Sequence, residues 1–336
     1  MKIQKKYDKK LAILNVLKEC DMPASAMRVT KLLSLGGLSF SERTVRFYLK
    51  ELDEAGLTVA NGKKGRKITE AGLAELQSSQ ITQRVGYLSA KIEQMIYGMD
   101  FDLPLRRGTV VINTSLVTPL QLANCSERIC KVFAKGYGMG ELMALLGPGE
   151  TIGKTTIPEG KIGFCTVCSI TINGILLKHG IPMTSRFGGL LRIKNGKALR
   201  FEEMVHYDGT SIDPLEVFIR SGMTDHTQAI KSGNGLIGAS FREVPAESRS
   251  RLINISQRLE DIGLGAIMEL GLSGQHMLDV PVPYGRVGAI VVGGLNPIAI
   301  LEERGHRSVS RALSGLMEYN RLFHYKEFPM KLNRYL

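Results

Sequence analysis

Residues 41–69, SERTVRFYLKELDEAGLTVANGKKGRKIT, contain the pattern that decides the fold of the first part of the chain. The residues around Glu42 have the spacing of a helix-start capping box, and apolar residues then recur at helical spacing until Gly56. A short strand, a turn of Gly and Lys, and a second short strand follow. Two more amphipathic helices are expected over 8–20 and 24–35. Three helices and a basic hairpin form, in this order, a winged helix-turn-helix.

The third helix and the hairpin supply the residue types that contact nucleic acid. In a winged helix the third helix enters the major groove, where Arg and Lys reach base edges, and the basic wing lies against phosphates. The candidate DNA-binding residues are Arg43, Thr44, Arg46, Phe47, Lys50, Lys63, Lys64 and Arg66. The alternative is that they form only the solvated charged face of a small helical bundle.

Composition and charge agree with this reading. The 336 residues are enough for two or three domains, and 43% hydrophobic with 23% charged residues excludes collagen-like, coiled-coil and disordered classes. Residues 1–84 hold 16 basic and nine acidic side chains, a net charge of +7, against +12 for the whole chain. We therefore expect a winged helix-turn-helix DNA-binding domain over 1–80, with a polyanion as its partner.

The chain is expected to be cytoplasmic, with no membrane partner. Its start, MKIQKKYDKK, lacks an apolar segment after the charges, and the most apolar later stretch is interrupted by Gly, Asn and Pro. Five cysteines in so long a chain do not form a disulfide framework, which fits a reducing compartment.

The body of the chain, 85–325, contains an internal duplication at an offset of 125 residues, relating 108–182 to 233–307. Each half is expected to form a strand, a helix that follows a proline, a glycine break, a short strand, then a strong strand and helix. The sequence therefore predicts an α+β fold: an N-terminal winged helix-turn-helix followed by an internally duplicated α+β regulatory domain. We expect two similar lobes, joined by the insert 183–232, with a cleft between them.

Three clusters in the body offer hydrogen-bond donors to a small acidic metabolite. They lie at 184–189 (TSRFGG), at 238–245 (GASFREVP), where Ser240 and Arg242 share one face of a predicted strand, and at 291–297 (VVGGLNP). The candidate effector-binding residues are Cys168, Ser185, Arg186, Phe187, Gly188, Ser240, Arg242, Gly293, Gly294 and Asn296. The alternatives are that the glycines only make turns and that Arg242 pairs with Glu243 or another carboxylate.

Metal and catalytic chemistry are disfavoured. Cys165 and Cys168 have the spacing of half a zinc ribbon, but no second pair exists, so both are interpreted as core, although Cys168 alone could face the cleft. The six histidines are scattered, and no Walker, dinucleotide or serine-hydrolase motif is present. Asp208 and Asp213 are expected in an Asx turn and a helix cap. No metal ligand, catalytic residue or required cofactor is therefore assigned.

Two stretches of the chain resemble known families. The stretch SERTVRFYLKELDEAGL is similar to the winged-helix domain of many bacterial and archaeal regulators and of some ribonucleases, which implies DNA more often than RNA. The segments GKIGFCTVCSITINGILLKHGIPMTSRFGGLLRI, YDGTSIDPLEVFI, GNGLIGASFREVP and YGRVGAIVVGGLNPIAILEE resemble the regulatory domain of the NrpR family of nitrogen repressors.

The second resemblance implies a repressor of nitrogen-assimilation genes that binds a palindromic double-stranded DNA operator as a homodimer. It also implies 2-oxoglutarate as the effector that releases the repressor from DNA. Two other functions remain open: an enzyme that acts on a small carboxylic acid and carries a winged-helix regulatory domain, and an RNA-binding regulator.

Overall fold

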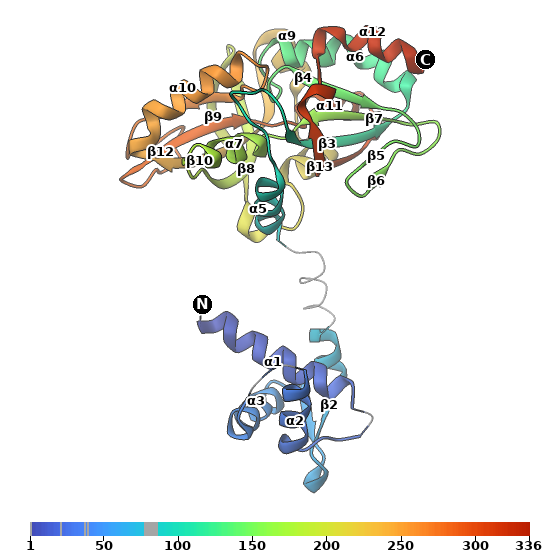
Figure 1. Ribbon diagram of the computed structural model, residues 1–336, viewed down its shortest axis with the longest axis vertical. Helices are drawn as coiled ribbons and strands as arrows, with labels where there is room; N and C mark the ends of the chain where they lie inside the picture. The colour runs from blue at the N-terminus through green and yellow to red at the C-terminus, as the bar shows by residue number, and fades with distance from the viewer. Residues whose placement is uncertain (1, 21, 37, 39, 77–86) are drawn as a thin grey trace. The chain divides into compact units, whose positions relative to one another are not determined.

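The computed structural model describes residues 2–20, 22–36, 38, 40–76 and 87–336 (Figure 1). The chain divides into two compact units, 1–86 and 87–336, and each is described by itself.

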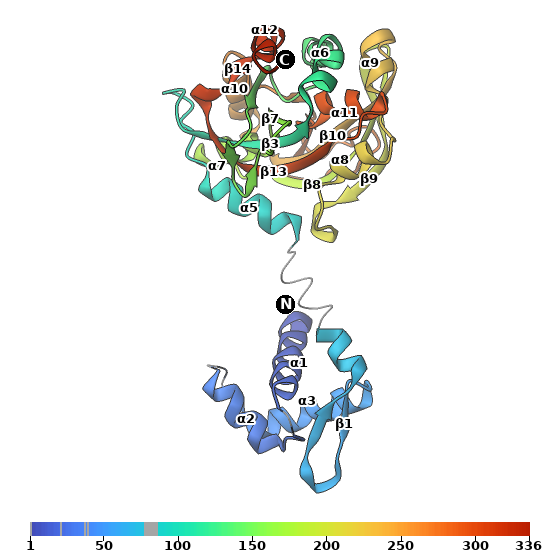
Figure 2. The same cartoon turned by 90° about the vertical axis from the view of Figure 1, so that its right-hand side faces the viewer.

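The first unit is a winged helix, as the sequence predicts. Apolar side chains from all three helices, including Leu14, Val29 and Leu49, are buried in one common core. The Oγ of Ser41 accepts a hydrogen bond from the Thr44 amide at 3.1 Å and so caps the third helix. Figure 2 shows the hairpin that follows. The elements are α1 (Lys2–Lys18), α2 (Ala26–Leu35), α3 (Glu42–Glu54), β1 (Thr58–Ala60), a 3₁₀ turn (Gly62–Lys64), β2 (Arg66–Ile68) and a helical segment over 70–76.

The second unit is built around two five-stranded antiparallel sheets (Figure 1). The first sheet has the order β13-β3-β7-β4-β14, and the second has the order β11-β12-β10-β8-β9. The strands are β3 (Thr109–Val117), β4 (Leu142–Leu146), β7 (Ile162–Val167), β8 (Thr184–Lys194), β9 (Lys197–His206), β10 (Gly235–Pro245), β11 (Ile267–Leu270), β12 (Arg286–Val292), β13 (Val309–Glu318) and β14 (Phe323–His324), with a small hairpin of β5 (Thr151–Ile152) and β6 (Thr155–Thr156).

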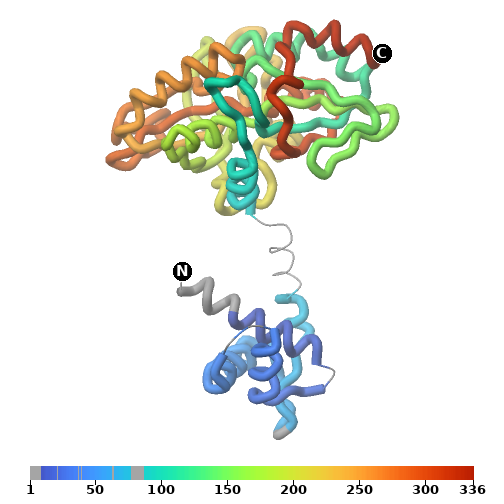
Figure 3. Tube along the Cα trace, in the orientation of Figure 1, coloured from blue at the N-terminus to red at the C-terminus, as the bar shows by residue number. Residues whose placement is uncertain are grey.

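Helices cover these sheets and connect their strands. The C-terminal helix α12 packs on α6, as the tube in Figure 3 shows. The helices are α5 (Leu88–Gly98), α6 (Pro119–Ala134), α7 (Ile170–Lys178), α8 (Pro214–Arg220), α9 (His226–Ser232), α10 (Arg249–Glu260), α11 (Asn296–Glu303) and α12 (Phe328–Leu332). None of the helices described in either unit is long and apolar enough to cross a membrane.

The two halves of this unit follow the same element order and exchange their last strands. The order β3-α6-β4-β7-α7-β8 is repeated as β10-α10-β11-β12-α11-β13. However, β8 pairs with β10, with Phe187 opposite Phe241, and β13 pairs with β3, with Leu316 opposite Val111. The segment 183–232 is therefore more than the connection expected from the sequence, because its strand β8 lies inside the second sheet.

The central strands β7 and β12 are buried along almost their whole length, which explains their continuous apolar sequence. Both lead directly into a helix, α7 or α11, at equivalent places in the two halves. The loops between these strands and helices hold Cys168, Ser169, Gly293 and Gly294 and form the base of the site described next.

Candidate functional site

One face of α3 is exposed and basic. Val45, Tyr48, Leu49 and Leu52 are buried, and because a helix repeats every 3.6 residues, the opposite face points to solvent. Arg43, Arg46, Phe47 and Lys50 are exposed on that face, and Thr44 is half-buried. The structure thus keeps the predicted cations of the third helix accessible to a polyanion.

Two of these cations form ion pairs with acidic residues one turn away on α3. An oxygen of Glu42 lies 2.6 Å from Nη2 of Arg46, and Glu54 lies 3.8 Å from Nζ of Lys50. Both pairs are exposed, so water and salt screen them and a phosphate group can compete for either cation. The Phe47 ring packs edge-on against Tyr48, with ring centroids 5.3 Å apart.

The wing presents Lys64 to solvent, whereas Arg66 has a different role from the predicted one. Nε of Arg66 lies 2.7 Å from an oxygen of Asp53, whose other oxygen accepts a hydrogen bond from Thr58. Arg66 thereby ties the hairpin to the end of α3 and is only half-exposed. The side chain of Lys63, another predicted contact, lies outside the described residues.

The second unit holds a small enclosed cavity whose lining comes from separate parts of the chain. The lining residues are Ile92, Asn113, Cys168, Ser169, Ile170, Tyr207, Asp213, Leu215, Gly294, Leu295 and Ala312. Cys168 and Gly294 are therefore the two predicted effector residues that reach it. A more open groove of about 620 Å³ shares Asp213 and Ala312 with the cavity and is bordered by α5, the β5–β6 hairpin and β13.

The start of α7 and the start of α11 both border the cavity. Ser169 precedes α7, and Gly294 and Leu295 precede α11. A helix N-terminus carries a partial positive charge and unpaired amides, so two of them at one cavity favour an anion.

A buried guanidinium lies directly behind this wall. Arg242 on β10 has no exposed surface. Its Nε donates to Ser240 Oγ at 3.1 Å, and its Nη atoms donate to the Ser169 carbonyl at 2.9 Å, to Ser169 Oγ at 2.6 Å and to Asn173 Oδ1. All these acceptors are neutral, and among the described residues no carboxylate oxygen lies within 4.0 Å of the Arg242 nitrogens. The guanidinium is therefore hydrogen-bonded but its charge is not neutralised by contact.

Two acids with raised pKa values lie nearby, Asp213 in the lining of both the cavity and the groove and Glu216 in the lining of the groove alone. Oδ1 of Asp213 caps α8 by accepting the Leu215 amide at 2.8 Å, as the sequence predicts, and burial raises the pKa of Asp213 to about 6. Burial also raises the pKa of Glu216 to about 7. Glu216 accepts the Ala312 amide and so holds a bulge in β13, where Leu313 has a φ of 50°.

The remaining predicted residues of the first cluster do not line the cavity. Ser185 accepts a hydrogen bond from Asn173, so it touches only the network around Arg242. Arg186 is partly exposed and lies 2.8 Å from Glu243, which neutralises it. Phe187 is a core residue, stacked on Phe241 with ring centroids 5.4 Å apart. Gly188 allows close packing, because a Cβ there would lie 3.0 Å from the Tyr207 hydroxyl.

The third cluster is also mainly structural. Asn296 donates to the carbonyls of Tyr137 and Gly238 at 2.9 and 2.8 Å and accepts the Gly238 amide, which fixes α11 to β10 and to the end of α6. The Gly293 amide donates to the Gly238 carbonyl, so it is not open to a ligand. Neither Gly293 nor Asn296 lines the cavity in this structure, and both support the loop that presents Gly294.

The sequence patterns do not single out Ser169, Tyr207 and Asp213 as cavity residues. Asp213 is predicted only as a helix cap, which it is, and nothing in its spacing shows that its other side faces a cavity. Burial raises the pKa of Tyr207, so its hydroxyl stays neutral at physiological pH. Within the described residues no group of three or more His, Cys, Asp or Glu is placed to hold a metal ion.

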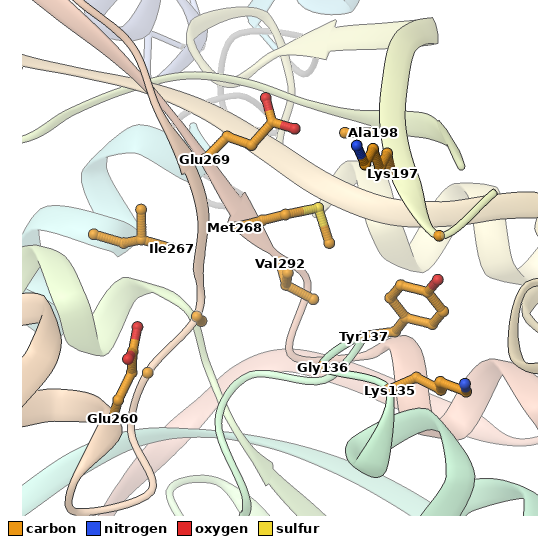
Figure 4. Close-up of a pocket in the computed structure, with 13 residues that line it drawn as sticks. Lys135, Gly136, Tyr137, Lys197, Ala198, Glu260, Ile267, Met268, Glu269 and Val292 are labelled. Atoms are coloured by element: carbon orange, nitrogen blue, oxygen red, sulfur yellow. The ribbon is translucent and has the colours of Figure 1, made fainter. Parts of the chain in front are cut away.

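A second hollow, of about 450 Å³, lies between the end of α6, the β8–β9 turn and β11 (Figure 4). It is lined by Lys135 and Lys197 but also by Glu260 and Glu269, and none of the predicted effector residues reaches it. Two positive and two negative side chains give little preference for a dianion. The cavity beside Arg242 is therefore the stronger candidate for an acidic ligand.

Both units are similar to known protein families. The family described as NrpR regulatory domains NRD1 and 2 matches residues 85–324, and the ribonuclease R winged-helix domain matches residues 11–76. The global nitrogen regulator NrpRI of Methanosarcina mazei is 33% identical over 93% of this chain and 96% of its own length. The global nitrogen regulator NrpR of Methanococcus maripaludis is 31% identical over 91% of this chain, which spans 53% of that relative.

A solved structure shares the fold. The crystal structure of a nitrogen repressor-like protein from Methanococcus jannaschii aligns with a TM-score of 0.61 at 23% identity, over 71% of this chain and 99% of that one. At this identity the alignment speaks for the fold alone, and it supports the predicted α+β class.

Proposed function

Because the chain belongs to the NrpR family of nitrogen regulators, we propose that it represses transcription by binding a palindromic operator as a homodimer and releases it when 2-oxoglutarate fills the cavity beside Arg242. The curated relatives are named as regulators, so the chain is a nitrogen-regulating transcriptional repressor and not an enzyme. Its winged helix gives DNA as the partner. The operator, the dimer and the effector are the proposed parts.

The buried, unneutralised charge of Arg242 is the observation that carries the effector proposal. A charged side chain without a counter-ion in a protein interior costs several kcal/mol, so such groups usually pair with an acid. Here the guanidinium is held by Ser169 and Asn173 immediately behind the cavity wall. Asp213, in the lining of the same cavity, acts on this charge only from beyond contact distance, so a ligand carboxylate supplies the contact ion pair that Arg242 lacks.

The shape and charge of the cavity support a small acid as its ligand. Two helix N-termini and Arg242 make one side positive. The enclosed space itself holds only about one water molecule, so a ligand of a few carbon atoms has to open it toward the groove along α5. A larger anion such as a nucleotide does not fit without opening of the groove along α5.

The exposed basic face of α3 supports operator binding. In a dimer, two such helices read half-sites about one helical turn, or a multiple of it, apart, so a modest change in their spacing weakens binding. The cations of α3 then select bases, while Lys64 of the wing contributes phosphate contact.

The test is DNA binding measured by fluorescence anisotropy, with a fragment carrying an inverted repeat upstream of ammonium-assimilation genes. We expect specific binding that 2-oxoglutarate weakens and that succinate, which lacks the oxo group, leaves nearly unchanged. Arg46→Ala should lower specific affinity, and Lys64→Ala should mainly reduce the salt dependence. Tighter binding of single-stranded RNA than of duplex DNA would contradict the operator-binding proposal and favour an RNA-binding regulator.

A further inference from the structure

Asp213 lines the same enclosed cavity that Arg242 supports from behind. Its Oδ1 is occupied by the Leu215 amide, and no Lys, Arg or His nitrogen among the described residues lies within 4.0 Å of its carboxylate. The cavity thus holds a cation behind one wall and an acid in another wall.

An ionised Asp213 carboxylate disfavours the binding of an oxo acid in this cavity. The carboxylate and oxo oxygens of such a ligand accept hydrogen bonds and cannot donate them, and an ionised aspartate is also only an acceptor. Two like charges enclosed together cannot both remain ionised at low cost, and one of them takes up a proton. A neutral carboxylic acid, in contrast, has one O–H donor to offer.

We infer that Asp213 determines the specificity of the cavity by binding an oxo acid in its neutral form, so that each ligand bound brings one proton from solvent onto the Asp213 carboxylate. This inference rests on the proposed effector function. The proton ends on an oxygen of Asp213, and the O–H donates to an oxygen of the ligand. The corresponding amino acid carries an ammonium group, which donates to the ionised carboxylate, and therefore needs no proton uptake.

On the cavity side, Asp213 is the residue that titrates near neutral pH, because each of the other groups that face it keeps a single protonation state. Burial raises the pKa of Cys168, at the end of β7, to about 12, and raises that of Tyr207, so both stay neutral. Arg242 of β10 stays charged and works against the burial that raises the pKa of Asp213 to about 6. Asp213 is therefore mostly ionised at pH 7.5 in the empty cavity and is able to take up a proton.

On the groove side, the charged groups are Glu216 of α8, Lys91 of α5, Lys154 of the β5–β6 hairpin and Arg311 of β13. Of these, Glu216 also titrates near neutral pH, because burial raises its pKa to about 7. Its carboxylate is engaged by the Ala312 amide and is absent from the lining of the enclosed cavity. Glu216 is therefore the matched control for Asp213.

The experiment is calorimetric titration of the full chain with 2-oxoglutarate at pH 7.5, in phosphate and in Tris, whose ionisation enthalpies differ. The dependence of the heat on the buffer gives the number of protons taken up, and we expect about one. The affinity should fall about tenfold per pH unit above pH 7. The preference for 2-oxoglutarate over L-glutamate should fall with the same slope.

Two variants separate Asp213 from its neighbour. Asp213→Asn keeps a helix-capping side chain and supplies a permanent N–H donor, so it should fold, bind 2-oxoglutarate without proton uptake and show flat affinity from pH 6 to 8. Glu216→Gln should retain the proton uptake. Thermal unfolding of each variant reports whether it folds.

The outcomes distinguish this inference from the effector proposal. Binding of 2-oxoglutarate to the wild-type chain with no buffer-dependent heat overturns the inference and leaves the effector standing. Uptake that survives in Asp213→Asn or disappears in Glu216→Gln also overturns it. Absence of binding to the wild-type chain at pH 6, where the proton is readily available, overturns both.

Discussion

Replacing Arg242 with Met separates the functional from the structural role of the buried charge. Met has a similar length and no polar group, so it fills most of the space. Of the acceptors that Arg242 leaves, the Ser169 carbonyl keeps the Ile172 amide, and Ser240 Oγ keeps its bond to the Val291 carbonyl. Oδ1 of Asn173 and Oγ of Ser169 are the two acceptors left with no other hydrogen bond found among the described residues.

The two opposing contributions nearly balance. Each buried acceptor without a partner costs about 1–3 kcal/mol, and a rotation of the Ser169 hydroxyl toward the cavity reduces the cost of the second one. Burial of the Arg242 charge without a counter-ion in contact costs several kcal/mol of desolvation, and its removal stabilises the fold by that amount. The same substitution removes four charge-assisted hydrogen bonds, which destabilises the fold. We therefore expect Arg242→Met to change the free energy of unfolding by no more than about 2 kcal/mol in either direction.

Effector affinity should behave differently from stability. Loss of the one cation behind the cavity should weaken 2-oxoglutarate binding by at least about 30-fold, because a hydrogen bond or contact with a charged group contributes roughly 2 kcal/mol. Adding Asn173→Leu should restore stability by about 1–3 kcal/mol without restoring binding.

Urea unfolding of the regulatory unit within the full chain and calorimetric titration measure the two quantities on the same variants. A loss of more than about 4 kcal/mol in Arg242→Met would identify the arginine as a structural residue. Unchanged affinity for 2-oxoglutarate in a folded variant would refute the effector role of Arg242.

Three further predictions concern other contacts. Glu42→Gln should tighten DNA binding several-fold in anisotropy titrations and steepen its salt dependence, because Arg46 loses its competing partner. Gly65→Ala should speed hydrogen exchange in α3 and destabilise the first unit by about 3 kcal/mol, because the residue has a φ of 112° and its Cβ would lie 2.3 Å from the Ala24 carbonyl oxygen. Glu303→Gln should destabilise the second unit by up to about 3 kcal/mol above pH 5, measured by urea unfolding, and by nearly nothing near pH 2.

The pH dependence expected of Glu303→Gln follows from the surroundings of Glu303. Burial would raise its pKa, but hydrogen bonds from His226 and Thr227 and the charge of His226 outweigh burial and lower the pKa to about 2 from its ordinary 4.5. A carboxyl group with a lowered pKa stabilises the fold above pH 4.5, and this stabilisation is lost as pH falls from 4.5 through 2.

Each of these three predictions has a matched control. Glu70→Gln removes one exposed negative charge outside α3 and should leave the salt dependence unchanged. Gly62→Ala also has a positive φ, 53°, but open space around it, so it should cost only about 1 kcal/mol. Glu159→Gln, at an exposed turn, should show no pH-dependent effect. Weaker DNA binding in the Glu42 variant, or a Gly65 variant as stable as its control, would contradict the stated reasons.

The winged helix could be predicted from the sequence because its pattern is local. The cap at Ser41, the apolar spacing of α3 and the Gly–Lys turn are set by residues near one another in the chain, and the structure reproduces each of them. Arg66 is the exception, since its partner Asp53 lies 13 residues away, beyond the hairpin, and no pattern in the sequence connects the two.

The cavity beside Arg242 could be predicted only in part. The two-residue period of a strand placed Ser240 and Arg242 on one face, and they do share it, but the period does not say that this face is covered by Ser169 and Asn173. Likewise Phe187 and Asn296 have residue types that suit a ligand, yet Phe187 stacks on Phe241 across the exchanged strands and Asn296 bonds to the backbone of Tyr137 and Gly238. The contacting segments lie far apart in the sequence, so no local pattern shows whether such a residue packs in the core or faces a ligand.

The duplication explains why equivalent helix starts from the two halves border the same cavity. Cys168 and Ser169 before α7 occupy the same place in their half as Gly293 and Gly294 before α11, so both halves contribute an equivalent helix start to a single space. The halves differ in what surrounds it: β10 supplies Arg242, whereas β3 has the apolar Val117 at the position 125 residues earlier. A symmetric pair of helix ends combined with one cation and one acid recognises the two ends of a ligand differently. If the proposed effector, an oxo-dicarboxylate with two unequal ends, binds here, we expect it in one orientation, with one molecule in each chain.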